Sequence, residues 1–197
     1  MGVSVMKHTS HLLLAGLVVT SFLVFSAAAR ADWDLIVKLG AFQLSKDSQT
    51  VSGVGLTFDD TASGVLSIEG QYRMKPDLTL GGELLGYTND WDSSIGSGDM
   101  DTGVLMFNIK KYFNTTKKVQ PYIGGGVGFA ATDLNGPGGT GTGSGLALQA
   151  MGGVELRFNK VGFYSELKWL GAKPEDEDGE KINVSGVGLF AGAAIHF

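Results

Sequence analysis

The sequence predicts an all-β fold, an eight-stranded antiparallel up-and-down transmembrane β-barrel. Eight segments of about 10 residues or a little more alternate apolar and polar side chains, the period of a strand and the length that crosses a bilayer at a tilt. The connections between them are alternately long and short, as in barrels with tight turns at one end and loops at the other. The mean hydropathy is positive, although no run of about 20 apolar residues follows residue 31.

The predicted strands follow from the period of two along the chain. They are Trp33–Leu44, Ser63–Met74, Leu78–Tyr87, Gly103–Phe113, Val119–Ala131, Leu146–Phe158, Val161–Leu170 and Ile182–Phe197. The long connections Thr88–Asp101, Thr132–Gly145 and Gly171–Lys181 are rich in polar residues and are expected to be loops. In the other long connection, Ser45–Ala62, the alternation of Val54, Leu56 and Phe58 indicates a hairpin above the membrane.

Residues 1–31 differ from the rest of the chain and are expected to be a cleaved signal peptide. Lys7 precedes an apolar run from Leu12 to Phe25, and the segment ends in Ala29-Arg30-Ala31. A basic start, a short apolar stretch and small residues at the cleavage site are typical of secretory signals. The alternative is an uncleaved anchor helix, and translation starts at either Met1 or Met6. The barrel domain is then residues 32–197.

Composition excludes several classes of function. The formal charge of −5 becomes −7 once Lys7 and Arg30 are removed, and the mature chain has no basic face, so we expect no nucleic-acid partner. The chain has no cysteine, which excludes disulfides and thiolate metal sites. We predict no cofactor.

Three stretches of this pattern resemble a known family. QPYIGGGVGF at 120–129, GGVELRF at 152–158 and the terminal FAGAAIHF resemble the Gram-negative outer-membrane β-barrel family, which includes the transmembrane domain of OmpA and the opacity-type surface proteins. The resemblance implies an integral protein of the cell outer membrane, in contact with outer-membrane lipid and lipopolysaccharide and folded by the barrel-assembly machinery. It also implies that Phe197 is the assembly signal.

Charged side chains occupy the alternate positions that would face the lumen. They are Lys38, Glu69, Arg73, Glu83, Lys110, Glu155, Arg157, Glu166 and Lys168. An eight-stranded barrel is just wide enough to be filled by side chains, and buried charges must be paired. We therefore expect a salt-bridged plug, with a proton or ion path as the alternative. Inward glycines, for example Gly124 and Gly192, are expected to make room for the long side chains.

Aromatic residues near the strand ends predict the two membrane interfaces. Those expected toward the short turns are Trp33, Tyr72, Phe113, Phe158, Phe163 and Phe197, and those expected toward the loops are Phe129 and Trp169.

Candidate catalytic and ligand motifs are weak. His196 is the single histidine after residue 31, with no serine and aspartate readable beside it, so it is expected to be a lumen or rim residue. Gly136-x-Gly138-x-x-Gly141 matches a dinucleotide-binding pattern, but no helix follows, so a flexible loop is predicted.

The two ends of the predicted barrel carry opposite charge. The short turns hold Lys75, Lys117, Lys118 and Lys160, and the loops hold Asp90, Asp92, Asp99, Asp101, Glu175, Asp176, Glu177, Asp178 and Glu180. The acidic loops are expected to be a solvated, mutually repelling set, with divalent-cation binding as the alternative.

The function expected from these features is that of a non-enzymatic small outer-membrane barrel. Its lumen is filled by side chains, and it contributes to envelope integrity or to surface interactions through acidic extracellular loops. The alternative is a porin-like narrow channel for small or hydrophobic solutes.

Overall fold

The structure is a computed structural model that describes residues 32–46, 48–51, 54–58, 62–94, 96–136, 139–176, 179 and 181–197. The predicted signal peptide lies outside these residues, as do Glu177, Asp178 and Glu180 of the acidic stretch. No helix in the described part of the chain is long and apolar enough to cross a membrane.

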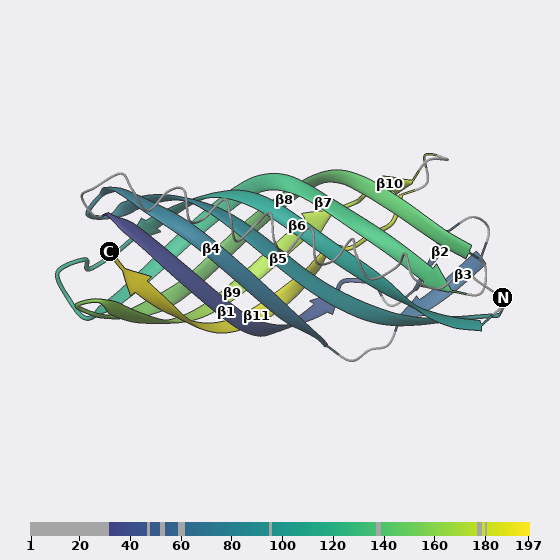
Figure 1. Cartoon of the computed structure of the whole chain (residues 1–197), viewed down its shortest axis with the longest axis horizontal. Helices are drawn as coiled ribbons and strands as arrows, with labels where there is room; N and C mark the ends of the chain where they lie inside the picture. The colour runs from purple at the N-terminus through teal and green to yellow at the C-terminus, as the bar shows by residue number, and fades with distance from the viewer. Residues whose placement is uncertain are drawn as a thin grey trace, which may run out of the picture. The chain divides into compact units, whose positions relative to one another are not determined.

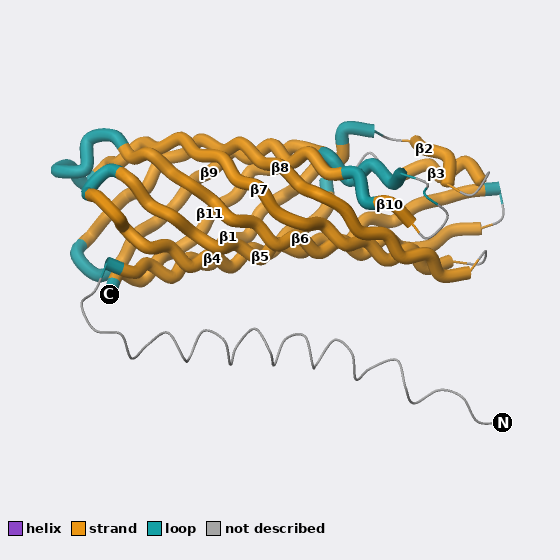
Figure 2. Tube along the Cα trace, turned by 90° about the horizontal axis from the view of Figure 1, so that it is seen from above, coloured by secondary structure: helices purple, strands orange, loops and turns teal. Residues whose placement is uncertain are grey.

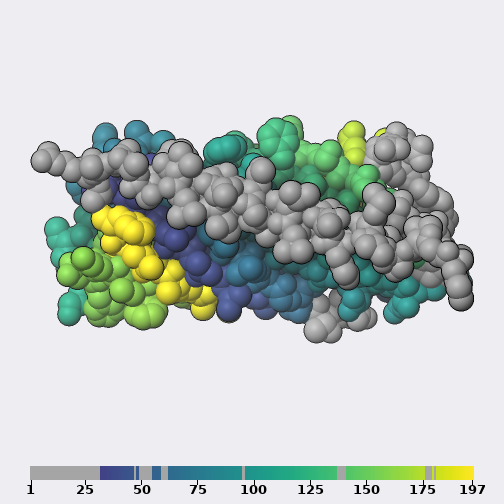
Figure 3. All heavy atoms as spheres, in the orientation of Figure 1, coloured from purple at the N-terminus to yellow at the C-terminus, as the bar shows by residue number. Residues whose placement is uncertain are grey.

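Eight antiparallel strands of residues 32–197 close into a barrel, which confirms the predicted fold class (Figure 1). They are β1 (Trp33–Leu44), β4 (Ser63–Lys75), β5 (Leu78–Ser93), β6 (Gly96–Tyr112), β7 (Val119–Gly136), β8 (Gly139–Phe158), β9 (Val161–Ala172) and β11 (Gly186–His196). Each strand pairs with its neighbours in sequence, and β1 pairs with β11 from Asp34↔His196 to Leu44↔Gly186. That last pairing closes the sheet, so the yellow end of the chain lies against the purple strand in Figure 3.

Three short strands extend the sheet beyond the loop ends of the barrel strands (Figure 2). The expected hairpin is present as β2 (Ser48–Val51) and β3 (Val54–Phe58), and β3 pairs with β5 through Phe58↔Trp91. Beyond Lys173 and Pro174, β10 (Glu175–Asp176) continues the line of β9 and pairs with β8 through Glu175↔Ser144.

Two of the predicted loops are strands, so these predictions were wrong. The pairs β5–β6 and β7–β8 continue without a break to Ser93↔Gly96 and Gly136↔Gly139. The barrel strands are accordingly 11 to 20 residues long rather than about 10. Gly136 and Gly141 belong to the β7–β8 hairpin instead of a flexible loop, and Gly138 lies outside the described residues.

The closing strand is also shorter than predicted. Residues 182–185 are not in a strand, although Ile182 and Val184 are fully buried. The Val184 backbone N–H donates to the Ala172 carbonyl, and the Tyr87 hydroxyl on β5 donates to the Val184 carbonyl at 2.9 Å. This stretch therefore covers the loop end of the lumen before β11 begins.

The connections at the other end are tight turns. The turns after β6 and β8 each contain an asparagine with positive φ, Asn114 at 55° and Asn159 at 35°. Asparagine tolerates this left-handed conformation better than most residues. All short connections meet at this end, which we call the turn end; the opposite end is the loop end.

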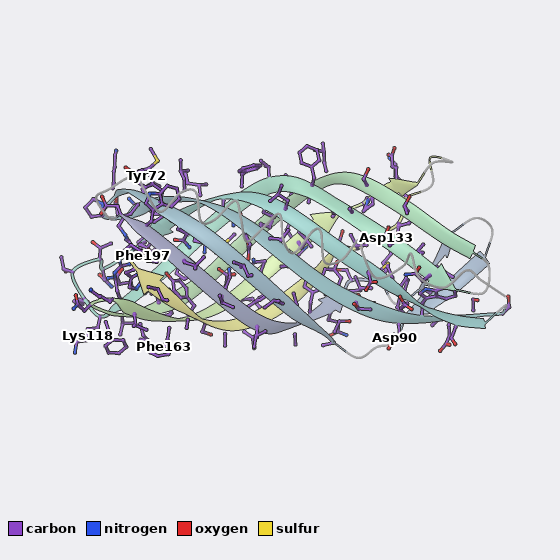
Figure 4. All side chains as sticks on the ribbon, viewed as in Figure 1. Tyr72, Asp90, Lys118, Asp133, Phe163 and Phe197 are labelled. Atoms are coloured by element: carbon purple, nitrogen blue, oxygen red, sulfur yellow. The ribbon has the colours of Figure 1, made fainter. Side chains whose placement is uncertain are left out.

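The two faces of the sheet have opposite character. The outward face exposes large apolar side chains along the barrel strands, among them Leu39, Phe107, Val127 and Leu189. The predicted aromatic residues all belong to this exposed set: Trp33, Tyr72, Phe113, Phe129, Phe158, Phe163, Trp169 and Phe197. Tyr72, Phe163, Phe197 and Lys118 lie at the turn end, and Asp90 and Asp133 lie toward the loop end (Figure 4). An apolar outer surface with polar ends suits a bilayer.

Candidate functional site

The lumen is the candidate site because it collects the charged side chains of the barrel. Successive inward residues on one strand define its layers. On β9 these are Tyr164, Glu166, Lys168 and Leu170, all buried. From Tyr164 toward the loop end, the lumen therefore passes from aromatic to ionic to apolar side chains.

The ionic layer contains three lysines and three glutamates with almost no solvent contact. Its members are Lys38, Glu69, Glu83, Lys110, Glu166 and Lys168. Lys38 is the hub, because its Nζ lies 2.9 Å from Glu69, 3.0 Å from Glu83 and 2.8 Å from Glu166. Lys110 contacts Glu69 at 2.7 Å, and Lys168 pairs with Glu83. The three positive and three negative charges balance, which is the condition for burying them.

Neutral groups satisfy the remaining carboxylate oxygens. The Tyr122 hydroxyl donates to Glu166 at 2.8 Å, and the Ser67 hydroxyl donates to Glu83 at 2.5 Å. The Gln149 side-chain amide donates to the other oxygen of Glu83 at 2.9 Å. Hydrogen bonds of this kind hold a buried charge cluster in one geometry.

A second charged cluster lies at the turn end of the lumen, where β1 meets β11. The His196 Nδ1 lies 2.6 Å from an Asp34 carboxylate oxygen, and Asp34 also contacts Arg73 and Arg157, each at 3.4 Å. Glu155 pairs with Arg157 at 3.2 Å. His196 therefore lies at the rim of the lumen with carboxylate partners, and no described serine or threonine hydroxyl is among its hydrogen-bond partners.

Tyrosine rings separate the two clusters. Tyr112, Tyr122 and Tyr164 are buried together, and the centroids of Tyr112 and Tyr122 are 5.1 Å apart. The Lys110 ammonium lies 5.1 Å from the Tyr122 ring centroid, and the Arg73 guanidinium lies 5.0 Å from that of Tyr112. Each ring thus packs against a cation from a neighbouring layer.

The loop-end half of the lumen is apolar, which corrects the expectation that polar groups fill the inward face. Phe42, Leu85, Met106, Leu170 and Phe190 are buried there in one cluster. The cluster continues to Trp91 and Met100 inside the strand extensions and to Val184 at the mouth.

Inward glycines permit this packing. A Cβ on Gly192 would lie 2.7 Å from Lys38 Cγ, and one on Gly124 would lie 2.9 Å from Lys110 Cγ, so these glycines make room for lysines as expected. Gly186 and Gly188 make room for Phe42 and Phe190 instead.

The acidic residues of the loop end form a ladder on the outer face of the extended hairpins. Asp90 on β5 is directly opposite Asp99 on β6, and Asp101 on β6 is directly opposite Asp133 on β7. Asp92 lies opposite Ser97. Among the described residues, no group of three or more histidine, cysteine or acidic side chains is arranged to hold a metal ion.

The lysines of the turn end are exposed. Lys75, Lys117, Lys118 and Lys160 all lie in or beside the short turns, and the Lys118 ammonium lies 5.8 Å from the Phe158 ring centroid. Lys111 pairs with Asp77, and this hydrogen bond to the ammonium lowers the pKa of the Asp77 carboxyl.

The closed barrel and its filled lumen can be compared with known proteins. The model of the outer membrane protein beta-barrel domain matches residues 15–185. The chain belongs to the outer-membrane β-barrel family. Family membership places it as an integral protein of the outer membrane, where lipopolysaccharide is present.

Solved structures of similar fold include two small outer-membrane barrels. Neisserial surface protein A (NspA) has a TM-score of 0.62 and 16% identity, covering 84% of this chain and 96% of that chain. Ail, the attachment invasion locus protein of Yersinia pestis, has a TM-score of 0.55 and 13% identity, covering 85% of this chain and 99% of that chain. No curated protein matches the sequence. At these identities the likeness concerns the fold alone.

The structure brings all nine charged residues expected in the lumen into two clusters, and it adds Asp34 and His196. Asp34 was not among the residues predicted for the lumen, although it has the same strand parity as Ile36 and Lys38. The neutral partners Ser67, Asn108 and Gln149 also share the parity of the charged residues. Strand parity was therefore a usable signal for them.

Proposed function

We propose that the protein is a non-enzymatic outer-membrane barrel with a filled lumen that contributes to envelope integrity or to surface interactions. The observation that supports this most strongly is the stack of layers between the two ends. Ion pairs around Lys38 and an apolar cluster around Phe42 and Phe190 occupy successive levels of the same lumen. A permeating ion would have to break the first layer and lose its hydration in the second.

Planar bilayer recording tests the filled lumen. We expect no steady single-channel conductance from the inserted protein, with insertion verified by heat-modifiable migration of the same sample on a gel. Steady conductance would favour the narrow channel for small or hydrophobic solutes. The Lys38→Ala variant provides a matched comparison, since it removes the hub of the ionic layer, leaves the apolar layer in place and should also give no steady conductance.

The acidic ladder supports a role in surface interactions. Asp90, Asp99, Asp101 and Asp133 face outward on hairpins that extend past the apolar belt. A set of like charges on a rigid strand surface is suited to a cationic partner or to divalent cations. Calorimetry with calcium tests the cation alternative, and the absence of heat at millimolar concentrations would remove it.

The surroundings of His196 support the absence of catalysis. Its ring nitrogens face Asp34 at 2.6 Å and Glu155 at 3.2 Å, at the end of the barrel opposite to the acidic hairpins. Incubation with lipopolysaccharide followed by mass spectrometry tests this proposal. We expect lipid A of unchanged mass, and any altered lipid A mass would refute a non-enzymatic role.

A further inference from the structure

A groove of about 800 Å³ opens on the outer face of the barrel, at the loop end of β8 and β9. Its apolar walls are Val127 on β7, Leu146 and Leu148 on β8, and Trp169 on β9. Lys173 and Ser185 line its loop-end side. The groove is separate from the lumen, because all of these apolar side chains point outward.

The strand register explains why the surface is hollow there. Gly171 is paired with Leu148 near the end of β9, and it is the one outward-facing residue between Trp169 and Lys173. A Cβ on Gly171 would lie 2.6 Å from Cη2 of Trp169, so the indole lies over the glycine. On the other side of Gly171, the Ser185 hydroxyl is held by hydrogen bonds with the Ala172 backbone at 3.1 and 3.2 Å.

The groove is apolar toward the membrane, and Lys173 and Glu175 line it toward the loop end. Leu146 is 73% exposed, the largest exposed fraction among the large apolar residues described. Lys173 follows Trp169 by two outward positions and has no hydrogen bond or ion pair with the residues that the structure describes. The neighbouring Glu175 is already paired with Lys181 at 2.9 Å. Tryptophan below an exposed ammonium is the arrangement of a membrane interface.

We propose that this groove binds lipid A, the phosphorylated lipid of the outer leaflet. One acyl chain lies against Leu146, Leu148 and the Trp169 indole, and a phosphate of the headgroup accepts a hydrogen bond from Lys173. An acyl chain fills the groove, and the apolar side chains that line it gain van der Waals contacts that an empty groove would lack. The phosphate supplies an anion for Lys173, which has no ion-pair partner among the described residues. The loop end faces the outer leaflet, since short turns lie on the periplasmic side of such barrels.

Quenching of tryptophan fluorescence tests the site. Trp169 is exposed in the groove, whereas Trp33 lies at the turn end and Trp91 is buried. A Trp33→Phe, Trp91→Phe protein is reconstituted in vesicles of brominated phosphatidylcholine, which quenches Trp169, and unlabelled lipid A is then added. Bound lipid A should displace the brominated lipid and restore fluorescence. We expect the Lys173→Gln variant to need about five-fold more lipid A for the same recovery.

One control, one further variant and one fallback measurement make the outcome decisive. Lys46→Gln removes an exposed lysine at the same end of the barrel and should leave the recovery curve unchanged. Gly171→Ala places a methyl group against the indole and should weaken recovery without affecting heat-modifiable migration. If the double-phenylalanine protein does not fold, the difference between the parent and Trp169→Phe gives the same signal.

Several results would overturn the proposal. Equal recovery curves for the parent and Lys173→Gln would remove the phosphate contact. Equal recovery by dephosphorylated lipid A would do the same, and equal recovery by phosphatidylglycerol would show that the groove accepts any anionic lipid rather than lipid A. None of these outcomes depends on whether the lumen conducts.

Discussion

Asp34 and His196 are cross-strand partners at the seam where the first and last barrel strands meet, and their side chains are 2.6 Å apart. Asp34 also contacts Arg73 from β4 and Arg157 from β8. One carboxylate therefore ties together three strands besides its own, and the histidine is one of three partners.

Asp34→Asn should destabilise the barrel more than His196→Gln. Loss of the carboxylate leaves two arginines with one remaining acid, Glu155, so we expect a cost of about 3 kcal/mol in the free energy of unfolding. His196→Gln leaves Asp34 with both arginines and should cost about 1 kcal/mol. Urea unfolding in vesicles measures both. Exposed Asp32→Asn is the control and should change little; a larger loss for His196→Gln would contradict this ranking.

Lys38→Met should be among the most destabilising single substitutions in the lumen. Three glutamates lie within 3.0 Å of the Lys38 ammonium, and its removal leaves three buried acids with two lysines. We expect a loss of about 3–5 kcal/mol in the free energy of unfolding. The same substitution at exposed Lys46 should change it by less than about 0.5 kcal/mol.

The double variant Lys38→Met, Glu166→Gln separates charge balance from packing. It leaves two acids and two lysines, so it should recover part of the stability lost in Lys38→Met. Urea unfolding again provides the measurement. A double variant that is less stable than Lys38→Met would show that hydrogen-bond geometry, rather than charge balance, dominates this layer.

Strand periodicity predicted the membrane part of the fold well because lipid and lumen demand opposite side chains on alternate positions. The strand Trp33–Leu44 was predicted with its observed bounds, and Ser63 was predicted as the start of the next. The periodicity signal failed where the strands leave the membrane. Thr88, Asp90 and Asp92 face outward there, so the apolar outward stripe ends although the strand continues.

The lumen charges were recognisable because charged residues on an otherwise apolar strand stand out. Their partners were not recognisable, since pairing across the lumen depends on how strands far apart in sequence are placed. Lys38 reaches Glu166, 128 residues away, and Asp34 reaches His196, 162 residues away. The apolar cluster in the loop-end half of the lumen was not predicted for a related reason. Phe42 and Phe190 lie on the first and last barrel strands, and only the closure of the barrel brings them together.

The pair formed by Lys111 and Asp77 should be visible in a pH titration. The hydrogen bond from Lys111 holds the pKa of Asp77 below its ordinary value of 3.8. The carboxylate consequently stays charged, and the pair stays intact, until the pH falls through this lowered pKa. Carboxyl NMR should report the lowered midpoint, and Lys111→Gln should raise it toward 3.8. Lys117→Gln is the control, and an equal shift in both variants would indicate general charge rather than this hydrogen bond.

The acidic ladder should weaken the hairpin extensions at low salt. Asp133 lies directly opposite Asp101, and like charges in that position are destabilising by up to about 1 kcal/mol. Asp133→Asn should therefore slow amide hydrogen exchange in the β6–β7 extension by about two- to five-fold at low salt. The difference should shrink at about 1 M salt, where the Debye length is about 3 Å. Asp92→Asn is the matched control, because Asp92 faces Ser97; an equal effect there would contradict the pairwise explanation.

Deletion of Phe197 should separate assembly from stability. The Phe197 side chain is 64% exposed, and its backbone N–H donates to the Trp33 carbonyl at 2.9 Å. Loss of one exposed ring and one hydrogen bond should cost only about 1–2 kcal/mol, so refolding in detergent should persist. If Phe197 is also the assembly signal, insertion into the outer membrane of cells should fall much further. The comparison uses heat-modifiable migration for refolded protein and membrane fractions for cells, with Phe163→Leu as a control for a lost interface ring. Equal impairment in detergent and in cells would mean that Phe197 acts through structure alone.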